Sequence, residues 1–541
     1  MRVSGSRLMA LALATALASR LTAAAERPPE LRGADRLTPI FDEILAARFD
    51  RARTALQSAC PPAPVEACHA LGAVAIWWQI VLDPDSRARD AELERAAMSA
   101  VADATAWTVR EPQNGEAFFY LAAAYAPLTE WRILRGQRLA AARDGNRIRS
   151  ALERALALDP SLVDAKFGLG LYHYIADVAP AASKVLRWLL LLPGGDRELG
   201  LREMLEARDR GVLLRGEADF QLHRLYLWYE HQPGRALELL AGLDARFPSN
   251  PIFLQRTAEV LDQYLRDHPG SAEVWQQLLD RARAGRTAAN GLAEARARLG
   301  LAVELEALHE TDRAMDHLQT VARLRPSAPF GATARAHLLM GEAHDRLGER
   351  EAALAAYRRA LDEDSAGRLP GLRSRAQAGL RRGPDQTIAQ AYRLSLDGWR
   401  ALERGEPAAA VTSLARATTL APGDAVMAYR YARALAATGD RAGARRWLER
   451  VVQSKAAVPA FALSAACVDL AALIEQTPQP VASTRMERND ARADKSRDEA
   501  RQVRSEALSL YERGLSIAGG DHRAQERARA AIARLRSERN F

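Results

Sequence analysis

Histidines are the residues of this 541-residue sequence that most often carry acid–base or metal chemistry, and ten of them are scattered along it. His309 and His317 lie eight residues apart, and His337 and His344 lie seven apart. Neither pair has a local carboxylate arrangement that indicates a metal site. Phosphate-loop, zinc-protease and nucleophile-elbow motifs do not occur, and Asp and Glu are spread too evenly to mark an acid–base pair. We therefore predict no catalytic residues, no metal site and no cofactor, and interpret the histidines as structural.

The first 25 residues have the parts of a secretory signal. Arg2 and Arg7 give a positive start, and Leu8 to Leu17 is an apolar run too short to cross a bilayer. Small residues at Ala23–Ala25 provide a cleavage point. We expect an exported protein, periplasmic or secreted; the alternative is an N-terminus that is apolar by chance.

Two of the three cysteines, Cys60 and Cys68, bracket the proline-rich loop 61–64 between two expected helices. In an exported protein this arrangement indicates a disulfide. Closing so short a loop stabilises the fold by about 2–3 kcal/mol in the chain-entropy description. Two unrelated buried thiols are the alternative. Cys467 lies in an Ala-rich segment and is interpreted as a small core residue.

The formal net charge is +8, and it falls to +5 without the first 25 residues. The basic residues are mostly arginines, and Asp and Glu are interspersed with them. This is typical of a solvated helical surface crossed by ion pairs rather than of a nucleic-acid-binding stripe. We therefore predict no nucleic-acid partner.

The elements that must position any functional residue are clearest from Ala391 to Val458, where two 34-residue units follow each other directly. Small or apolar residues recur at unit positions 4, 8, 11, 20, 24 and 27. Small residues at 8 and 20 let two helices approach closely, and a small residue at 27 lets the next unit stack. The recurring residues are Leu394, Gly398, Ala401, Ala410, Leu414 and Ala417, followed by Pro422, and then Ala428, Ala432, Leu435, Ala444, Leu448 and Val451.

This pattern resembles the tetratricopeptide repeat, in which each unit is a pair of antiparallel helices. Units 217–250, 295–328 and 334–367 fit the same frame, and less regular units begin at Gly115. The resemblance implies an all-α fold, a right-handed superhelix (α-solenoid) of antiparallel helix pairs with two or three inserted segments. A fainter resemblance covers 180–211, where Pro180 to Leu186 and Gly195 to Leu201 are similar to the tetratricopeptide-39 and inclusion-body-clearance proteins. We take no function from it.

The expected organisation follows the chain in order. Leu37 to Leu56 is expected to form one amphipathic helix of an N-terminal cap. The polar, proline-containing insert 477–500 is expected to be disordered. The predicted parts are a signal peptide (1–25), a helical cap (26–114), irregular repeats with inserts (115–216), regular repeats (217–367), a spacer (368–390), further repeats (391–519) and a C-terminal capping helix (520–541).

The family resemblance implies that helix-A positions 2, 5, 9 and 12 line a concave groove that binds peptides or helices of other proteins. Trp, Tyr and Arg there often carry interface energy. The alternative is that these rings pack against inserted segments, which would then fill the groove. The predicted groove residues are Phe119, Tyr174, Trp228, Gln255, Arg335, Trp399, Tyr429 and Arg433.

Two functional hypotheses follow. The first is a non-catalytic exported scaffold that binds a protein or peptide partner in the groove. The second is a peripheral envelope factor that contacts membrane through the arginine-rich insert 131–149 and the apolar insert 180–193. An enzyme would need residues assembled across several repeats, a constellation that the sequence does not reveal.

Overall fold

The computed structural model of the chain describes residues 31–178, 194–476 and 490–537, with side chains in the last range from 498 onward. Within these ranges the chain forms 24 helices and no strand, which confirms the all-α prediction. The chain divides into two compact units, Met1–Gln232 and Pro233–Phe541. The predicted signal peptide, the insert 180–193 and residues 477–489 lie outside the described residues.

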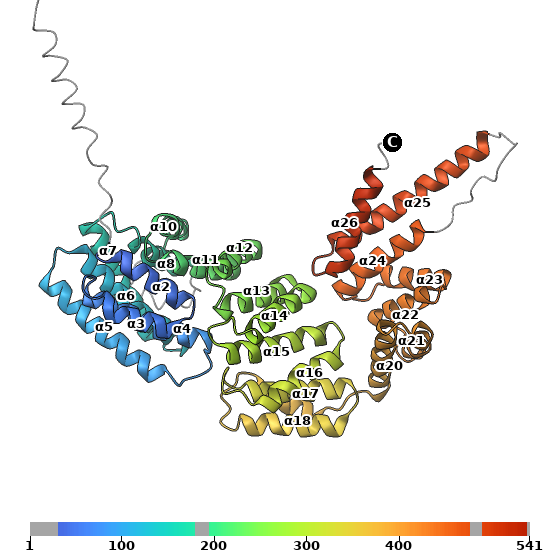
Figure 1. Cartoon of the computed structure of the whole chain (residues 1–541), viewed down its shortest axis with the longest axis horizontal. Coiled ribbons are helices and arrows are strands. Elements are labelled where there is room, and N and C mark those ends of the chain that lie inside the picture. Colours follow the sequence, from blue (N-terminus) through green and yellow to red (C-terminus); the bar gives the residue numbers. More distant parts are fainter. Residues whose placement is uncertain (1–30, 179–193, 477–489, 538–541) are drawn as a thin grey trace, which may run out of the picture. The chain divides into compact units, whose positions relative to one another are not determined.

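The first unit, drawn from blue to green in Figure 1, is built from successive helices that pack in pairs. Helix α4 packs against α5, α6 against α7, and α8 against α10. The division after Gln232 falls inside the predicted repeat 217–250, so the two helices of that repeat belong to different units. The helices of the first unit are α2 (Ala34–Leu45), α3 (Phe49–Ala59), α4 (Val65–Leu82), α5 (Asp90–Arg110), α6 (Gly115–Leu134), α7 (Arg138–Leu158), α8 (Ala165–Val178), α10 (Arg197–Arg210) and α11 (Arg215–Trp228).

The single helix predicted over Leu37 to Leu56 is wrong, because the chain breaks it into α2 and α3. Ala47 takes a left-handed conformation with φ of 58°. Its N–H bonds to the Ile44 carbonyl, and the Arg48 N–H bonds to the Glu43 carbonyl. A left-handed residue with such bonds ends a helix by satisfying its last carbonyl groups.

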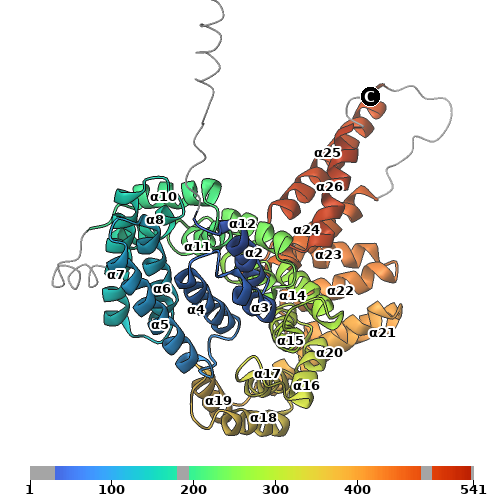
Figure 2. The same ribbon diagram turned by 60° about the vertical axis from the view of Figure 1, so that its left-hand side comes forward.

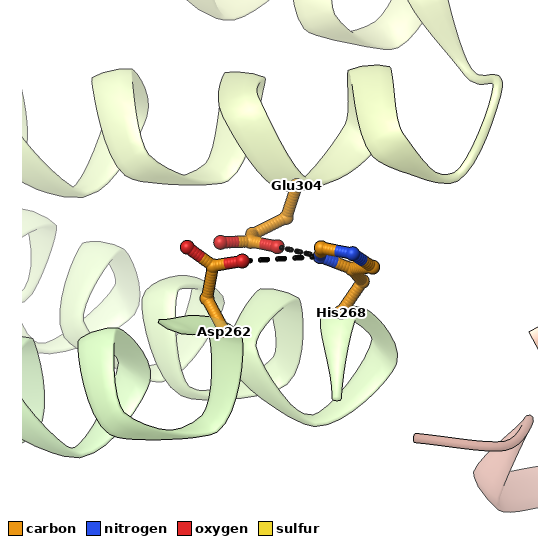
Figure 3. Close-up of side chains that lie close together, drawn as sticks. All are labelled: Asp262, His268 and Glu304. Atoms are coloured by element: carbon orange, nitrogen blue, oxygen red, sulfur yellow. Dashed lines mark hydrogen bonds and ion pairs between the residues drawn. The ribbon is translucent and has the colours of Figure 1, made fainter. Parts of the chain in front are cut away.

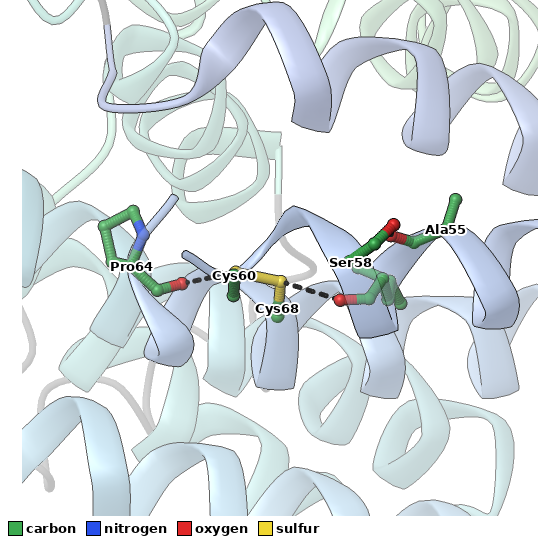
Figure 4. The surroundings of a disulfide bond; sticks show 6 residues. Ala55, Ser58, Cys60, Pro64 and Cys68 are labelled. Carbon is green, nitrogen blue, oxygen red and sulfur yellow. Dashed lines mark hydrogen bonds between the residues drawn. A yellow bond between two sulfur atoms is a disulfide. The ribbon is translucent and has the colours of Figure 1, made fainter. Parts of the chain in front are cut away.

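A disulfide joins Cys60, at the end of α3, to Cys68 in α4, with their Cα atoms 6.4 Å apart (Figure 4). This is the pairing expected from the sequence. Helix α4 is also long and apolar enough to cross a membrane by length and composition. More than half of its most apolar window is buried in the unit, where α4 contacts α2, α3, α5 and α6.

The second unit contains the regular repeats, and its helices pack in consecutive pairs from α13–α14 to α24–α25, with α19 packed on α18. Its helices are α12 (Pro233–Arg246), α13 (Pro251–Leu265), α14 (His268–Arg283), α15 (Asn290–Ala307), α16 (Thr311–Leu324), α17 (Ala332–Arg346), α18 (Arg350–Glu363), α19 (Leu372–Arg381), α20 (Gln386–Glu403), α21 (Pro407–Leu420), α22 (Ala425–Ala437), α23 (Arg441–Val452), α24 (Ala460–Glu475), α25 (Asp490–Ser516) and α26 (His522–Ser537).

Small residues bring the two helices of a repeat together as the 34-residue frame predicts. A Cβ added at Gly398 in α20 would lie 2.6 Å from Leu414 Cγ in α21, well inside van der Waals contact. Ala410, Leu414 and Ala417 are completely buried. The repeat spacing therefore fixes the core of this helix pair.

Arginines tie distant parts of the second unit together in a way that the frame does not predict. Arg400 in α20 contacts Asp312 at 2.6 Å and Glu310 at 3.2 Å, both near the start of α16. Arg430 in α22 is buried and donates to the His309 carbonyl at 2.8 Å and to Ser395 Oγ at 3.2 Å. These contacts join the α15–α16 turn to the first helices of later repeats.

The C-terminal helices α24, α25 and α26 lie side by side (Figure 2). The predicted disordered insert 477–500 is wrong for its second part, since residues 490–500 begin α25. Their Ala, Arg, Glu and Lys content favours a helix that continues into the packed segment after them. In α26, His522 Nε2 lies 3.0 Å from Asp267 Oδ2, so this end of the chain contacts the start of α14.

Candidate partner-binding surface

In the first unit, α4 contacts the start of α11, the helix that carries the predicted groove residue Trp228. The Trp78 ring of α4 lies 4.8 Å from the Phe220 ring of α11, and its Nε1 donates to Glu217 Oε2 at 3.1 Å. Trp78 is almost completely buried. Trp78 of α4 therefore packs against the first turns of α11.

Glu217, in the first turn of α11, has a carboxyl group whose pKa is raised. Burial raises the pKa of its carboxyl to about 7, and the nearby Glu130 raises it further, while bonds from Gln221 and Trp78 oppose the shift. The Gln221 amide donates to Glu217 Oε1 at 3.0 Å. The Glu217 carboxyl is fixed by these two hydrogen bonds. We assign it a structural role.

Trp228, at the end of α11, is the predicted groove residue with the most exposed ring in the first unit. It is 50% exposed, and the Arg224 guanidinium lies 4.7 Å from its ring centroid. Phe119 and Tyr174, by contrast, are buried, and the Tyr174 hydroxyl donates to Glu230. Of these three predictions, Trp228 has the surface that binding requires.

In the second unit, several predicted groove residues make side-chain hydrogen bonds between the first helices (helices A) of successive repeats. Arg296 of α15 donates to Gln255 Oε1 at 2.7 Å. Tyr429 is buried, and its hydroxyl donates to Asp469 Oδ2 of α24 at 3.2 Å, with Arg433 3.4 Å from the same oxygen. A structural role is thus visible for these residues, and their partner-binding role stays a prediction.

Trp399 and Arg335 are partly buried. The Arg430 guanidinium lies 5.3 Å from the Trp399 ring centroid, and Trp399 Nε1 is buried without a hydrogen-bond partner among the described residues. The ring therefore belongs to the same interior cluster as Arg430. Its partner-binding role also stays a prediction.

A pocket of about 290 Å³ opens between the first helices of three repeats, α17, α20 and α22, and the α15–α16 turn. Tyr392 is anchored in it by a 2.8 Å hydrogen bond between its hydroxyl and Thr311 Oγ1. Ile388 is 59% exposed. The lining residues are His309, Asp345, Arg346, Pro384, Asp385, Ile388, Ala389, Tyr392, Asp424 and Met427.

Some charged residues around this pocket have ion-pair partners, and others do not. Arg346 pairs with Glu306 at 2.9 Å, and Asp345 pairs with Arg350 at 3.0 Å. Asp385 and Asp424 instead cap α20 and α22 through backbone N–H groups, and neither has an ion pair within the described ranges. Burial lowers the pKa of His309 to about 4, so the imidazole is neutral at neutral pH. The pocket thus combines apolar walls with an acidic rim.

Sequence reasoning missed this pocket because its lining comes from separated segments. Ile388 falls in the predicted spacer 368–390, whereas α20 begins at Gln386. The sequence signal was Ile388 itself, an apolar residue three positions before the unit that starts at Ala391.

A wider hollow of about 690 Å³ lies elsewhere in the second unit. It is lined by the second helices α16 and α18 and by the first helix α17.

The arginine-rich insert 131–149 lengthens α6 and α7 into a hairpin rather than forming a separate segment. Ile133, Leu134 and Leu139 at its tip are exposed. Most of its arginines are paired within the unit: Arg132 and Arg147 with Asp144, Arg135 with Asp90, and Arg149 with Glu153; Arg138 and Arg143 are exposed without ion pairs among the described residues.

Comparison with known protein families identifies repeats in two segments of the chain. Two family models of the tetratricopeptide repeat match, at residues 334–366 and 401–467. A solved structure titled as the TPR2AB-domain:pHSP90-complex of yeast Sti1 is 12% identical, covers 59% of this chain and 98% of that chain, and has a TM-score of 0.21.

The TPR domain of P58(IPK) is 15% identical, covers 86% of this chain and 97% of that chain, and has a TM-score of 0.22. No curated protein matches significantly. The family-model segments coincide with the helix pair α17–α18 and with the run from the end of α20 to α24. The chain therefore contains tetratricopeptide repeats, at residues 334–366 and 401–467.

Proposed function

We propose that the protein is an exported, non-catalytic scaffold that binds an extended protein segment on the first-helix face of its second unit. The repeat family supports an interaction role in general. The pocket beside Ile388 and Tyr392 carries the specific proposal. It is lined by the first helices of three repeats, by the residues just before α20 and α22, and by the α15–α16 turn.

The chemistry of the pocket defines the partner. Ile388, which is 59% exposed, offers apolar contact, and this favours an apolar side chain of the partner. Asp385 and Asp424 at the rim favour a basic residue beside it. We therefore expect a segment with an apolar anchor next to Lys or Arg.

Affinity capture from the native host's envelope fraction tests this proposal with a matched pair of variants. Ile388→Glu places a charge at the pocket, whereas Leu324→Glu places the same charge at the end of α16, a second helix. Both residues are 59% exposed, so neither change should unfold the chain. Trp228→Ala and Trp399→Ala are added to test the two predicted tryptophans.

A partner retained by wild type and Leu324→Glu but lost by Ile388→Glu supports the pocket. Loss of at least about tenfold in affinity, or about 1.4 kcal/mol, is expected, since the carboxylate of Ile388→Glu takes the place of the apolar surface against which the partner's apolar anchor packs. A partner retained equally by Ile388→Glu would place binding elsewhere. Loss in Trp228→Ala alone would move the site to α11.

Export is proposed from the sequence of the first 25 residues. N-terminal sequencing of the protein from fractionated native cells tests it. The expected result is a mature chain that starts near residue 26 in the periplasmic or secreted fraction. An intact Met1 in the cytoplasmic fraction would refute export.

A second candidate function is peripheral membrane contact through the tip of the α6–α7 hairpin. The observation in its favour is that exposed Ile133, Leu134 and Leu139 lie beside Arg138 and Arg143. Flotation with anionic vesicles tests it against Leu139→Glu. No flotation of wild type at low salt would remove this candidate.

A further inference from the structure

Three ligand-type side chains from consecutive helices converge in the second unit (Figure 3). Asp262 lies in the last turn of α13, His268 begins α14, and Glu304 lies in the last turn of α15. His268 Nδ1 is 2.9 Å from Glu304 Oε2 and 3.3 Å from Asp262 Oδ1. One ligand atom from each residue falls within 4.8 Å of the others.

These separations suit a small divalent ion. A tetrahedral zinc site with bonds of about 2.0–2.1 Å holds its ligand atoms about 3.3 Å apart. The two distances from His268 Nδ1 to the carboxylate oxygens, 2.9 and 3.3 Å, lie slightly below or at that spacing. The three atoms can therefore surround one ion with little movement of the backbone.

The charges of the cluster also favour a cation. Glu304 is 2% exposed, and its only ion pair among the described residues is with His268. Asp262 likewise pairs with His268 and with no Lys or Arg of the described ranges. Two carboxylates around one imidazole leave negative charge uncompensated.

A second layer of contacts holds the cluster in place. Ser271 Oγ lies 3.0 Å from Glu304 Oε1 and 3.0 Å from the Ala258 carbonyl. Asp267 caps α14 by accepting the Gly270 N–H at 3.0 Å. The helices themselves pack through a shared core that includes Leu254, Trp275 and Leu301. Such support orients ligands and strengthens metal binding.

We propose that Asp262, His268 and Glu304 bind one zinc-class divalent transition-metal ion, through His268 Nδ1 and one oxygen of each carboxylate. The ion takes the place of the proton that His268 shares with the two acids. Water can take the fourth position, because the side chains of Asp262 and His268 are partly exposed. This site goes beyond the proposed scaffold function and does not depend on it.

The cluster was invisible in the sequence because its residues are separated by six and 36 positions. The chain also supplies a matched control. His522 likewise lies between two carboxylates, but Asp267 contacts its Nε2 and Glu273 its Nδ1, on opposite sides of the ring. One ion cannot bind both ring nitrogens of the same imidazole.

The test uses the full chain without a histidine tag, stripped with EDTA and titrated with ZnCl₂ by calorimetry. Metal retained after gel filtration gives the stoichiometry, and Co²⁺ absorption reports the coordination geometry. The variants are His268→Ala and Glu304→Gln, with His522→Ala as the control. Far-UV circular dichroism verifies that each variant keeps its helices.

The expected result is one Zn²⁺ per wild-type or His522→Ala chain, and at least tenfold weaker binding by His268→Ala and Glu304→Gln. If His268→Ala fails to fold, the isosteric Glu304→Gln decides alone. Substoichiometric zinc on wild type, or equal binding by wild type and Glu304→Gln, would overturn the proposal.

Discussion

Gly341→Ala in α17 should destabilise the second unit although alanine is the better helix former. The added Cβ would lie 2.5 Å from Tyr357 Cε1 and 2.6 Å from Cδ1, whereas carbon atoms pack at about 3.5–4.0 Å. The ring would have to move by about 1 Å. It is buried, its hydroxyl donates to Asp345 Oδ2 at 2.9 Å, and it also packs closely over Gly379.

Overpacking of this kind costs about 1–3 kcal/mol, and the helix propensity of alanine returns about 0.5–1 kcal/mol. The net loss expected for Gly341→Ala is therefore about 0–2.5 kcal/mol, with a midpoint near 1 kcal/mol. Gly242→Ala in α12 is the control, because a Cβ there meets nothing within 4 Å. It should stabilise its helix by about 0.5–1 kcal/mol.

Urea unfolding followed by circular dichroism at 222 nm compares the two variants, and hydrogen exchange localises the change to α17 and α18. Local readout matters because repeat arrays need not unfold in one step. If Gly341→Ala raises the midpoint as Gly242→Ala does, the close approach of α17 and α18 is refuted.

Two further predictions concern the first unit. Reduction of the Cys60–Cys68 disulfide should lower its stability by about 2.5 kcal/mol in urea unfolding, with no change in the second unit, whose Cys467 is a buried free thiol; equal stability of oxidised and reduced protein would contradict this. The folded state binds the Glu217 proton more tightly than the unfolded chain, so stability should fall as pH rises from about 4.5 to about 7. Glu217→Gln should flatten that dependence in thermal unfolding followed by Trp fluorescence, and an unchanged pH profile would refute the burial of the acid.

The repeat frame predicted local structure well because the close approach of two helices depends on neighbouring small residues. Ala410, Leu414 and Ala417 are buried where the 34-residue spacing places them. The same frame placed Tyr429 in the groove, but its hydroxyl contacts α24. Position in a repeat predicts the direction of a side chain, and the side chains of the next repeat, here Asp469, determine what it contacts.

Features that depend on distant segments were not predictable. The pocket at Ile388 requires the α15–α16 turn to reach α20, and Arg400 and Arg430 stabilise that contact over some 90 to 120 residues. The contact between α4 and α11 likewise depends on the packing of Trp78 against Phe220, which lies 142 positions later in the sequence. Neither contact leaves a spacing signal in the sequence.

The most direct test of the scaffold proposal is hydrogen–deuterium exchange of the full chain with and without its captured partner. The account predicts slower exchange in the first turns of α20 and α22, around Asp385 and Asp424, with no change in the second helices α16, α18 and α21. Protection confined to the second helices, or to the α6–α7 hairpin tip, would contradict it.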